Sequence, residues 1–97
     1  MIVVQNHIPV NPKYSQEFEK RFENTNQNLK QMKGFVKNMI LRPIEADTYV
    51  VMTYWETLED FQAWTGSEEF RKAHSVKNPS DMFTGRPNLT VHQVVEQ

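Results

Sequence analysis

The chain has 97 residues, with 11 Lys and Arg against 12 Asp and Glu, a formal net charge of −1 and no Cys. We expect one domain spanning residues 1–97, with a core modest enough for dimerisation to be a natural remedy. The interspersed charges argue against nucleic acid as a partner, and the lack of Cys excludes disulfides, thiolate metal sites, thiol catalysis and cofactor attachment through Cys. No apolar stretch approaches the roughly 18 residues that span a membrane, and no secretory leader opens the chain, so we expect a cytoplasmic protein without a membrane partner.

Residues 1–10 are predicted to form a β-strand, because apolar side chains occupy its even positions. Asn6 also occupies an even position, so we expect its side chain to face the core. A buried amide is unfavourable unless its donor and acceptor find partners. The strand alone leaves two readings open: Asn6 is bonded to neighbouring backbone, or it serves whatever shares the cavity.

A helix is expected next, over about residues 12–32. Asn11 followed by Pro12 is a plausible start, with Ser15 as a competing N-cap. Gly34 ends the segment, because glycine tolerates the left-handed conformation. Apolar side chains at helical spacing form one stripe, which we interpret as the core face: Tyr14, Phe18, Phe22, Leu29 and Met32.

The middle of the chain predicts a hairpin followed by two short helices. Residues 35–42 and 48–55 are rich in β-branched, aromatic and Met side chains, as paired strands are. Thr57, with Asp60 three residues later, resembles a capping box and begins the first helix. The apolar edge of that helix is Leu58, Phe61 and Trp64, and Gly66 ends or kinks it.

Ser67 is expected to cap the second short helix, on which Phe70 and His74 share one face. Residues 75–88 lack periodicity and form a loop of unusual length, which in small domains is often functional. Residues 89–95 alternate well enough for a last strand. The resulting order, βαββαβ, predicts an α+β ferredoxin-like fold, with an antiparallel sheet covered by helices on one face.

His74 is the histidine that stands out by position. His7 lies on the polar side of the first strand, and His92 alternates among polar neighbours. Taken alone, a His at a helix C-terminus is more often a favourable contact with the helix dipole than a ligand. A neutral imidazole at the mouth of an apolar pocket is, however, what an axial ligand of haem iron requires, and Trp64 and Phe70 are suited to form its walls.

Two cations of the long loop are candidate partners for the propionate groups of a haem. Lys77 and Arg86 carry the charge that attracts a carboxylate. Each is explained equally well as a solvated loop charge, so the choice stays open.

Residues 57–74 resemble the signature segment of the small dimeric α+β barrel proteins of the antibiotic biosynthesis monooxygenase superfamily. Together with Asn6 in the first strand, this segment is similar to that of the IsdG-type haem-degrading monooxygenases. The resemblance implies a homodimer whose two sheets form a barrel, with haem as both cofactor and substrate. It also implies a reaction that uses O2 and an external electron donor, such as a reductase, to open the porphyrin ring and release iron.

The resemblance implies a role for three candidate residues. His74 is the proximal iron ligand and the metal-binding residue. Asn6 stands on the distal side, where its amide hydrogen-bonds the oxygen that reacts. Trp64 presses the porphyrin out of planarity. Phe70 is expected to line the haem pocket because of its place beside His74, and the resemblance assigns it no role.

Other readings of the same residues stay open at this point. In a cofactor-free monooxygenase acting on an aromatic or quinol substrate, Asn6 and Trp64 orient the substrate and oxygen while His74 shuttles a proton. A non-catalytic haem-binding protein uses His74 alone and leaves the macrocycle intact. In the simplest case the pocket residues are merely packed in a dimeric barrel.

Overall fold

The computed structural model describes residues 1–74 and 78–97, and for residues 24–26 it describes the backbone. The elements follow the predicted order, with a short 3-10 helix added before the first long helix. They are β1 (Ile2–Ile8), η1 (Pro12–Tyr14), α1 (Ser15–Leu29), β2 (Phe35–Leu41), β3 (Tyr49–Trp55), α2 (Leu58–Thr65), α3 (Glu68–Ala73) and β4 (Asn88–Gln93). The βαββαβ prediction is confirmed.

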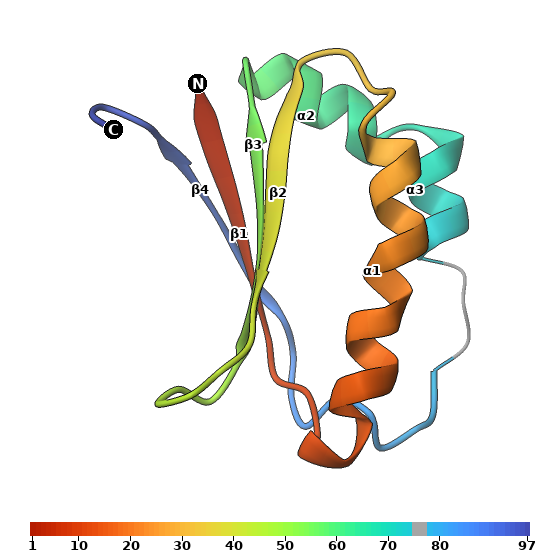
Figure 1. Cartoon of the computed structure of the whole chain (residues 1–97). Helices are drawn as coiled ribbons and strands as arrows, with labels where there is room; N and C mark the ends of the chain where they lie inside the picture. The colour runs from red at the N-terminus through yellow and green to blue at the C-terminus, as the bar shows by residue number, and fades with distance from the viewer. Residues whose placement is uncertain (75–77) are drawn as a thin grey trace.

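The four strands form one antiparallel sheet in the order β2-β3-β1-β4, and the helices lie on one side of it (Figure 1). The strand β1 is therefore central, with β3 and β4 as its neighbours. Its residue Asn6 lies directly opposite Val51 of β3 and Leu89 of β4. Opposed residues point to the same face, so these three side chains share one side of the sheet.

The core lies between the sheet and the helices. One cluster joins Val4 and Trp55 of the sheet to Leu29 and Trp64 of the helices, and a second joins Val10, Phe18 and Tyr49. The apolar stripe predicted for the long helix is confirmed as core. Because Val4 packs toward the helices, the even residues of β1 face them, and Asn6 lies on that side as predicted.

The long helix ends at Leu29, earlier than the predicted residue 32. Met32 lies in the turn that follows, where its N–H donates to the Leu29 carbonyl at 3.0 Å, and its side chain still packs against the core. Gly34 adopts a φ of 81°, which confirms the expected left-handed stop. A side chain at this position would also collide with the carboxylate of Asp60.

The N-caps predicted at Asn11, Thr57 and Ser67 are confirmed, and the competing cap at Ser15 is wrong. Asn11 caps η1, whereas Ser15 has helical backbone angles (φ −55°, ψ −47°), follows η1 as its C-cap and is the first residue of α1. The Thr57 hydroxyl accepts from the Asp60 N–H at 3.1 Å, and the Ser67 hydroxyl accepts from the Phe70 N–H at 3.2 Å.

The last strand is shorter than predicted and ends at Gln93. Gln93 pairs with Ile2, the first residue of β1, and beyond this pair the Val94 N–H donates to the Met1 carbonyl at 3.0 Å without extending the strand. Of the loop before it, residues 75–77 lie outside the described part. The described remainder is held to the segment between β1 and η1, where the Asn11 N–H donates to the Met82 carbonyl at 2.7 Å. Among the described residues, no helix is long and apolar enough to cross a membrane.

Candidate active site

A cleft of about 480 Å³ lies on the helix side of the sheet. Its size is within the range of roughly 300–1,000 Å³ that small-molecule sites occupy. Several of the side chains that line the cleft are apolar, and one of the lining residues is His74. The lining residues are Ile8 of β1, Phe18, Arg21, Phe22 and Asn28 of α1, Lys72, Ala73 and His74 at the end of α3, and Asn78 and Phe83 of the loop beyond.

His74 is exposed and held in a defined orientation. Its Nδ1 lies 2.9 Å from the carbonyl oxygen of Phe70. A carbonyl only accepts, so Nδ1 carries the proton and donates. In the neutral imidazole this leaves the lone pair on Nε2, the arrangement found in most metal-binding histidines. The expectation that Phe70 and His74 share a face is confirmed, since their ring centroids are 4.1 Å apart with the planes inclined by 31°.

Trp64 lies behind Phe70 rather than on the cleft wall. Its indole is only 6% exposed and packs in the core cluster with Val4 and Leu29. It meets Phe70 edge to face, with centroids 5.6 Å apart and planes at 89°. Contact between the indole and a ligand in the cleft therefore requires the Phe70 ring or α3 to move.

Asn6 carries a buried oxygen, Oδ1, that has no hydrogen-bond partner among the described residues. The reading in which this oxygen is satisfied by neighbouring backbone is therefore wrong for the structure described. An unpaired buried acceptor costs about 1–3 kcal/mol, so it needs an explanation. Ile8, two residues along the same face of β1, lines the cleft, which places Asn6 beside it. The Oγ1 of Thr90 is also buried without a hydrogen-bond partner among the described residues. Thr90 lies opposite Gln5 in the sheet, however, so its side chain is on the face away from the cleft.

The structure brings three predicted residues into one contact series, Trp64 to Phe70 to His74, and sets Asn6 on the strand that borders the cleft. Of the four, His74 alone is among the cleft-lining residues.

Among the described residues, the cations that line the cleft are Arg21 and Lys72. Of the two cations that the sequence suggested, Arg86 is exposed and does not line the cleft, and Lys77 lies outside the described residues. The sequence held a signal for both cleft-lining cations, because Arg21 adjoins Phe22 of the apolar stripe and Lys72 closely precedes His74.

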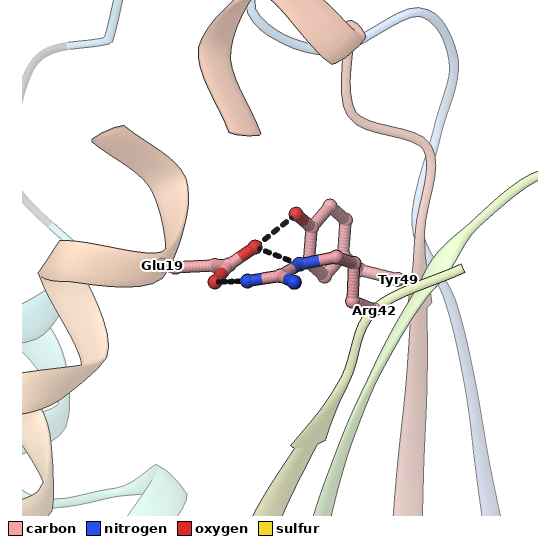
Figure 2. Close-up of polar contacts among 3 residues, drawn as sticks. All are labelled: Glu19, Arg42 and Tyr49. Atoms are coloured by element: carbon pink, nitrogen blue, oxygen red, sulfur yellow. Dashed lines mark hydrogen bonds and ion pairs between the residues drawn. The ribbon is translucent and has the colours of Figure 1, made fainter. Parts of the chain in front are cut away.

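Sequence reasoning also missed a polar cluster on the far side of α1. Arg42, just beyond β2, donates to both carboxylate oxygens of Glu19 at 2.8 and 2.6 Å, and the Tyr49 hydroxyl donates to the same carboxylate at 2.5 Å (Figure 2). These hydrogen bonds, from Arg42 first and then Tyr49, lower the pKa of Glu19 from 4.5 to about 2. We call these three residues the Glu19 clasp; it joins α1 to β2 and β3.

Comparison with known proteins matches residues 1–76 to the family model described as antibiotic biosynthesis monooxygenase. Over 81 residues the chain is 36% identical to a haem-degrading monooxygenase of Shouchella clausii, covering 80% of this chain and 75% of that relative. Over 96 residues it is 31% identical to a mycobilin-producing haem oxygenase of Mycobacterium tuberculosis, covering 98% and 90%.

A solved structure gives the same result. The chain superposes on a haem-degrading protein of Mycobacterium tuberculosis, which has two haems bound in its active site, with a TM-score of 0.83 and 32% identity. The match covers 100% of this chain and 98% of that one.

Proposed function

The chain belongs to the antibiotic biosynthesis monooxygenase family, and on that premise we propose that it is a haem-degrading monooxygenase that opens the porphyrin ring and releases iron. The observation that carries the proposal is the His74 imidazole at the cleft, with Nδ1 bonded to a carbonyl and Nε2 left to bind a metal. Relatives of 31–36% identity that are named as haem-degrading enzymes support it.

The residues present fit haem as a substrate. A haem is flat and largely apolar with two carboxylates at one edge, so it requires apolar walls, one axial donor and cations at the rim. Phe18 and Phe22 supply apolar wall, and Arg21 and Lys72 supply cations. The unpaired amide oxygen of Asn6 is a polar group for which the described residues offer no partner.

Each residue then has a separate task. The bound haem supplies the iron at which O2 is activated, with electrons from an external donor such as a reductase. We assign His74 Nε2 as the axial ligand, held in place through its Nδ1–H. The Asn6 amide is the polar group that orients the reacting oxygen. We assign Phe70 to the wall of the pocket beside His74. Trp64 lies behind it and would press the porphyrin out of planarity only after the Phe70 ring or α3 moves to bring the indole to the cleft.

Arg21 and Lys72 are proposed to pair with the two propionates. Both line the cleft, and both carry the positive charge that forms charge-assisted hydrogen bonds with a carboxylate. The pairing fixes which edge of the macrocycle faces solvent.

We also propose that the protein is cytoplasmic and that it forms a homodimer. In this dimer the sheet faces that no helix covers pack against each other. Odd positions of β1 face away from the helices, and so do the residues paired with them in β2 and β3. Among these, Met39 and Leu41 are exposed although they are apolar. A second copy of the chain would remove this surface from water.

A haem titration followed by turnover tests the proposal. Haem is added to the purified protein and absorbance is recorded, and ascorbate is then added in air with an iron chelator present. We expect a saturable Soret band at one haem per chain that decays as chelated iron appears. A stable band would identify a haem carrier, and no band would overturn the proposal and favour a cofactor-free oxygenase, to be tested on quinols.

A further inference from the structure

We propose that Ser67 and Phe70 are positioning residues that fix the plane of the His74 imidazole and leave its Nε2 free. The inference rests on the proposed haem site and extends it from the ligand to the residues that orient the ligand.

A single hydroxyl joins the two short helices. The Ser67 Oγ donates to the Trp64 carbonyl at 2.7 Å and accepts from the Phe70 N–H at 3.2 Å. Ser67 therefore ties the last turn of α2 to the first turn of α3. Trp64, at the start of this connection, is nearly fully buried in the core, so the connection begins at a fixed point.

The Phe70 carbonyl carries the connection to the ligand. It accepts from the His74 backbone N–H at 3.1 Å and from Nδ1 at 2.9 Å. The first bond fixes the position of the residue at the end of α3, and the second fixes the rotation of its ring. One acceptor thus determines both where the imidazole lies and which of its nitrogens is free.

The Phe70 ring adds a third constraint. It packs on the imidazole at 4.1 Å between centroids, and Trp64 packs edge to face against it at 5.6 Å. The imidazole is exposed, and an exposed side chain would otherwise lose rotational freedom on binding. Holding it beforehand lowers that cost, which is the usual effect of groups that orient a metal ligand.

The first test removes the Phe70 ring and keeps its carbonyl. In Phe70→Leu we expect haem affinity to fall by roughly 10-fold, the lower end of the range for partners of a metal ligand. The Fe–His stretching band of the ferrous complex in resonance Raman spectra should also shift. Phe61→Leu is the matched control: Phe61 packs in the same cluster, 6.0 Å from Trp55, and has no ring contact with His74 among the described residues.

The second test removes the hydroxyl at the junction. In Ser67→Ala we expect a smaller loss of affinity and a Raman shift in the same direction, both restored in Ser67→Thr. Thr57→Ala is its control, because Thr57 caps α2 with the same bond that Ser67 makes to α3, and does so away from His74. Melting of the haem-free proteins measures what each change costs in stability alone.

The outcomes separate the inference from the proposed function. Shifted Raman bands in Phe70→Leu and Ser67→Ala, with unshifted bands in both controls, support the positioning role. If His74→Ala loses haem but neither variant differs from its control, the positioning role is wrong and the haem site stands. If the wild-type protein shows no Soret band, or His74→Ala binds haem as tightly as wild type, both the proposed haem site and the positioning role are wrong.

Discussion

Two side chains with polar groups on the same face of the sheet, Tyr49 and Asn6, differ in whether their oxygen atoms have hydrogen-bond partners. Tyr49 is 2% exposed and its hydroxyl donates to Glu19 of the Glu19 clasp. Asn6 holds a buried oxygen that has no partner among the described residues. The two lie on adjacent strands, since Ile8 and Asn6 of β1 pair with Tyr49 and Val51 of β3.

The difference separates groups that stabilise the fold from groups that serve a ligand. A buried polar group adds to stability when its partner is built into the protein, and it lowers stability when that partner is absent. We infer that the polar groups of the Glu19 clasp have all their partners within the protein, whereas the Asn6 oxygen gains its partner when haem is bound. The predictions below test this contrast, from the largest expected effect to the smallest.

Trp64→Ala tests whether the proposed haem site depends on the packing of the core beneath it. Because the indole is buried among Val4, Leu29 and Trp55, we expect a loss of about 3–5 kcal/mol in the free energy of unfolding, measured by denaturant. Trp64→Phe should fold, bind haem in a flatter form and degrade it slowly. Wild-type ruffling of the haem in Trp64→Phe would contradict the proposed distortion.

His74→Ala removes the proposed axial ligand, and we expect haem affinity to fall by roughly 100-fold, equivalent to about 2.7 kcal/mol. The haem-free protein should melt as wild type does, because the imidazole is exposed. His92→Ala, an exposed histidine of β4, is the matched control and should bind haem normally. A Soret titration that is the same for both variants would refute the assignment of the ligand.

Tyr49→Phe breaks one hydrogen bond of the Glu19 clasp. We expect the free energy of unfolding to fall by about 1.5 kcal/mol, because a hydrogen bond to a charged carboxylate disappears. The ring stays, so its packing against Phe18 at 4.9 Å is kept and haem turnover should be unchanged. Thermal melts and turnover assays measure the two effects. Lost turnover at unchanged stability would mean that the clasp belongs to the active site.

Acid should weaken the Glu19 clasp selectively. The folded-state pKa of Glu19 is lowered to about 2 from 4.5, so its contribution to stability is present above pH 4.5 and is lost as the pH falls from 4.5 toward 2. Glu19→Gln should therefore show a flatter fall in melting temperature over that interval than wild type. Parallel curves for the two proteins would contradict this account of Glu19.

The sequence predicted the order of elements well because periodicity and caps are local. Thr57 and Ser67 cap the helices expected of them, and Gly34 takes the expected left-handed turn. The errors are at element ends, where tertiary contacts decide: Met32 packs in the core without continuing α1, and β4 ends at Gln93, two residues before the predicted end.

The site was harder to predict because its contacts join distant segments. The spacing of Phe70 and His74 is a local signal, and the structure agrees with it. The pairing of Glu19 with Arg42 and the cleft positions of Arg21 and Lys72 depend on how α1 lies against the sheet and α3. No pattern within a single element reveals such pairs.

The most direct test of the central claim compares Asn6→Leu, which is close in size to the native residue, with Tyr49→Phe. Melting of the haem-free proteins and ascorbate-driven iron release are measured for both. We predict that Asn6→Leu melts at or above the wild-type temperature, because an unpaired buried oxygen is removed, and that it degrades haem roughly 100-fold more slowly. If Asn6→Leu instead melts as low as Tyr49→Phe and degrades haem at the wild-type rate, Asn6 serves the fold and the claim is wrong.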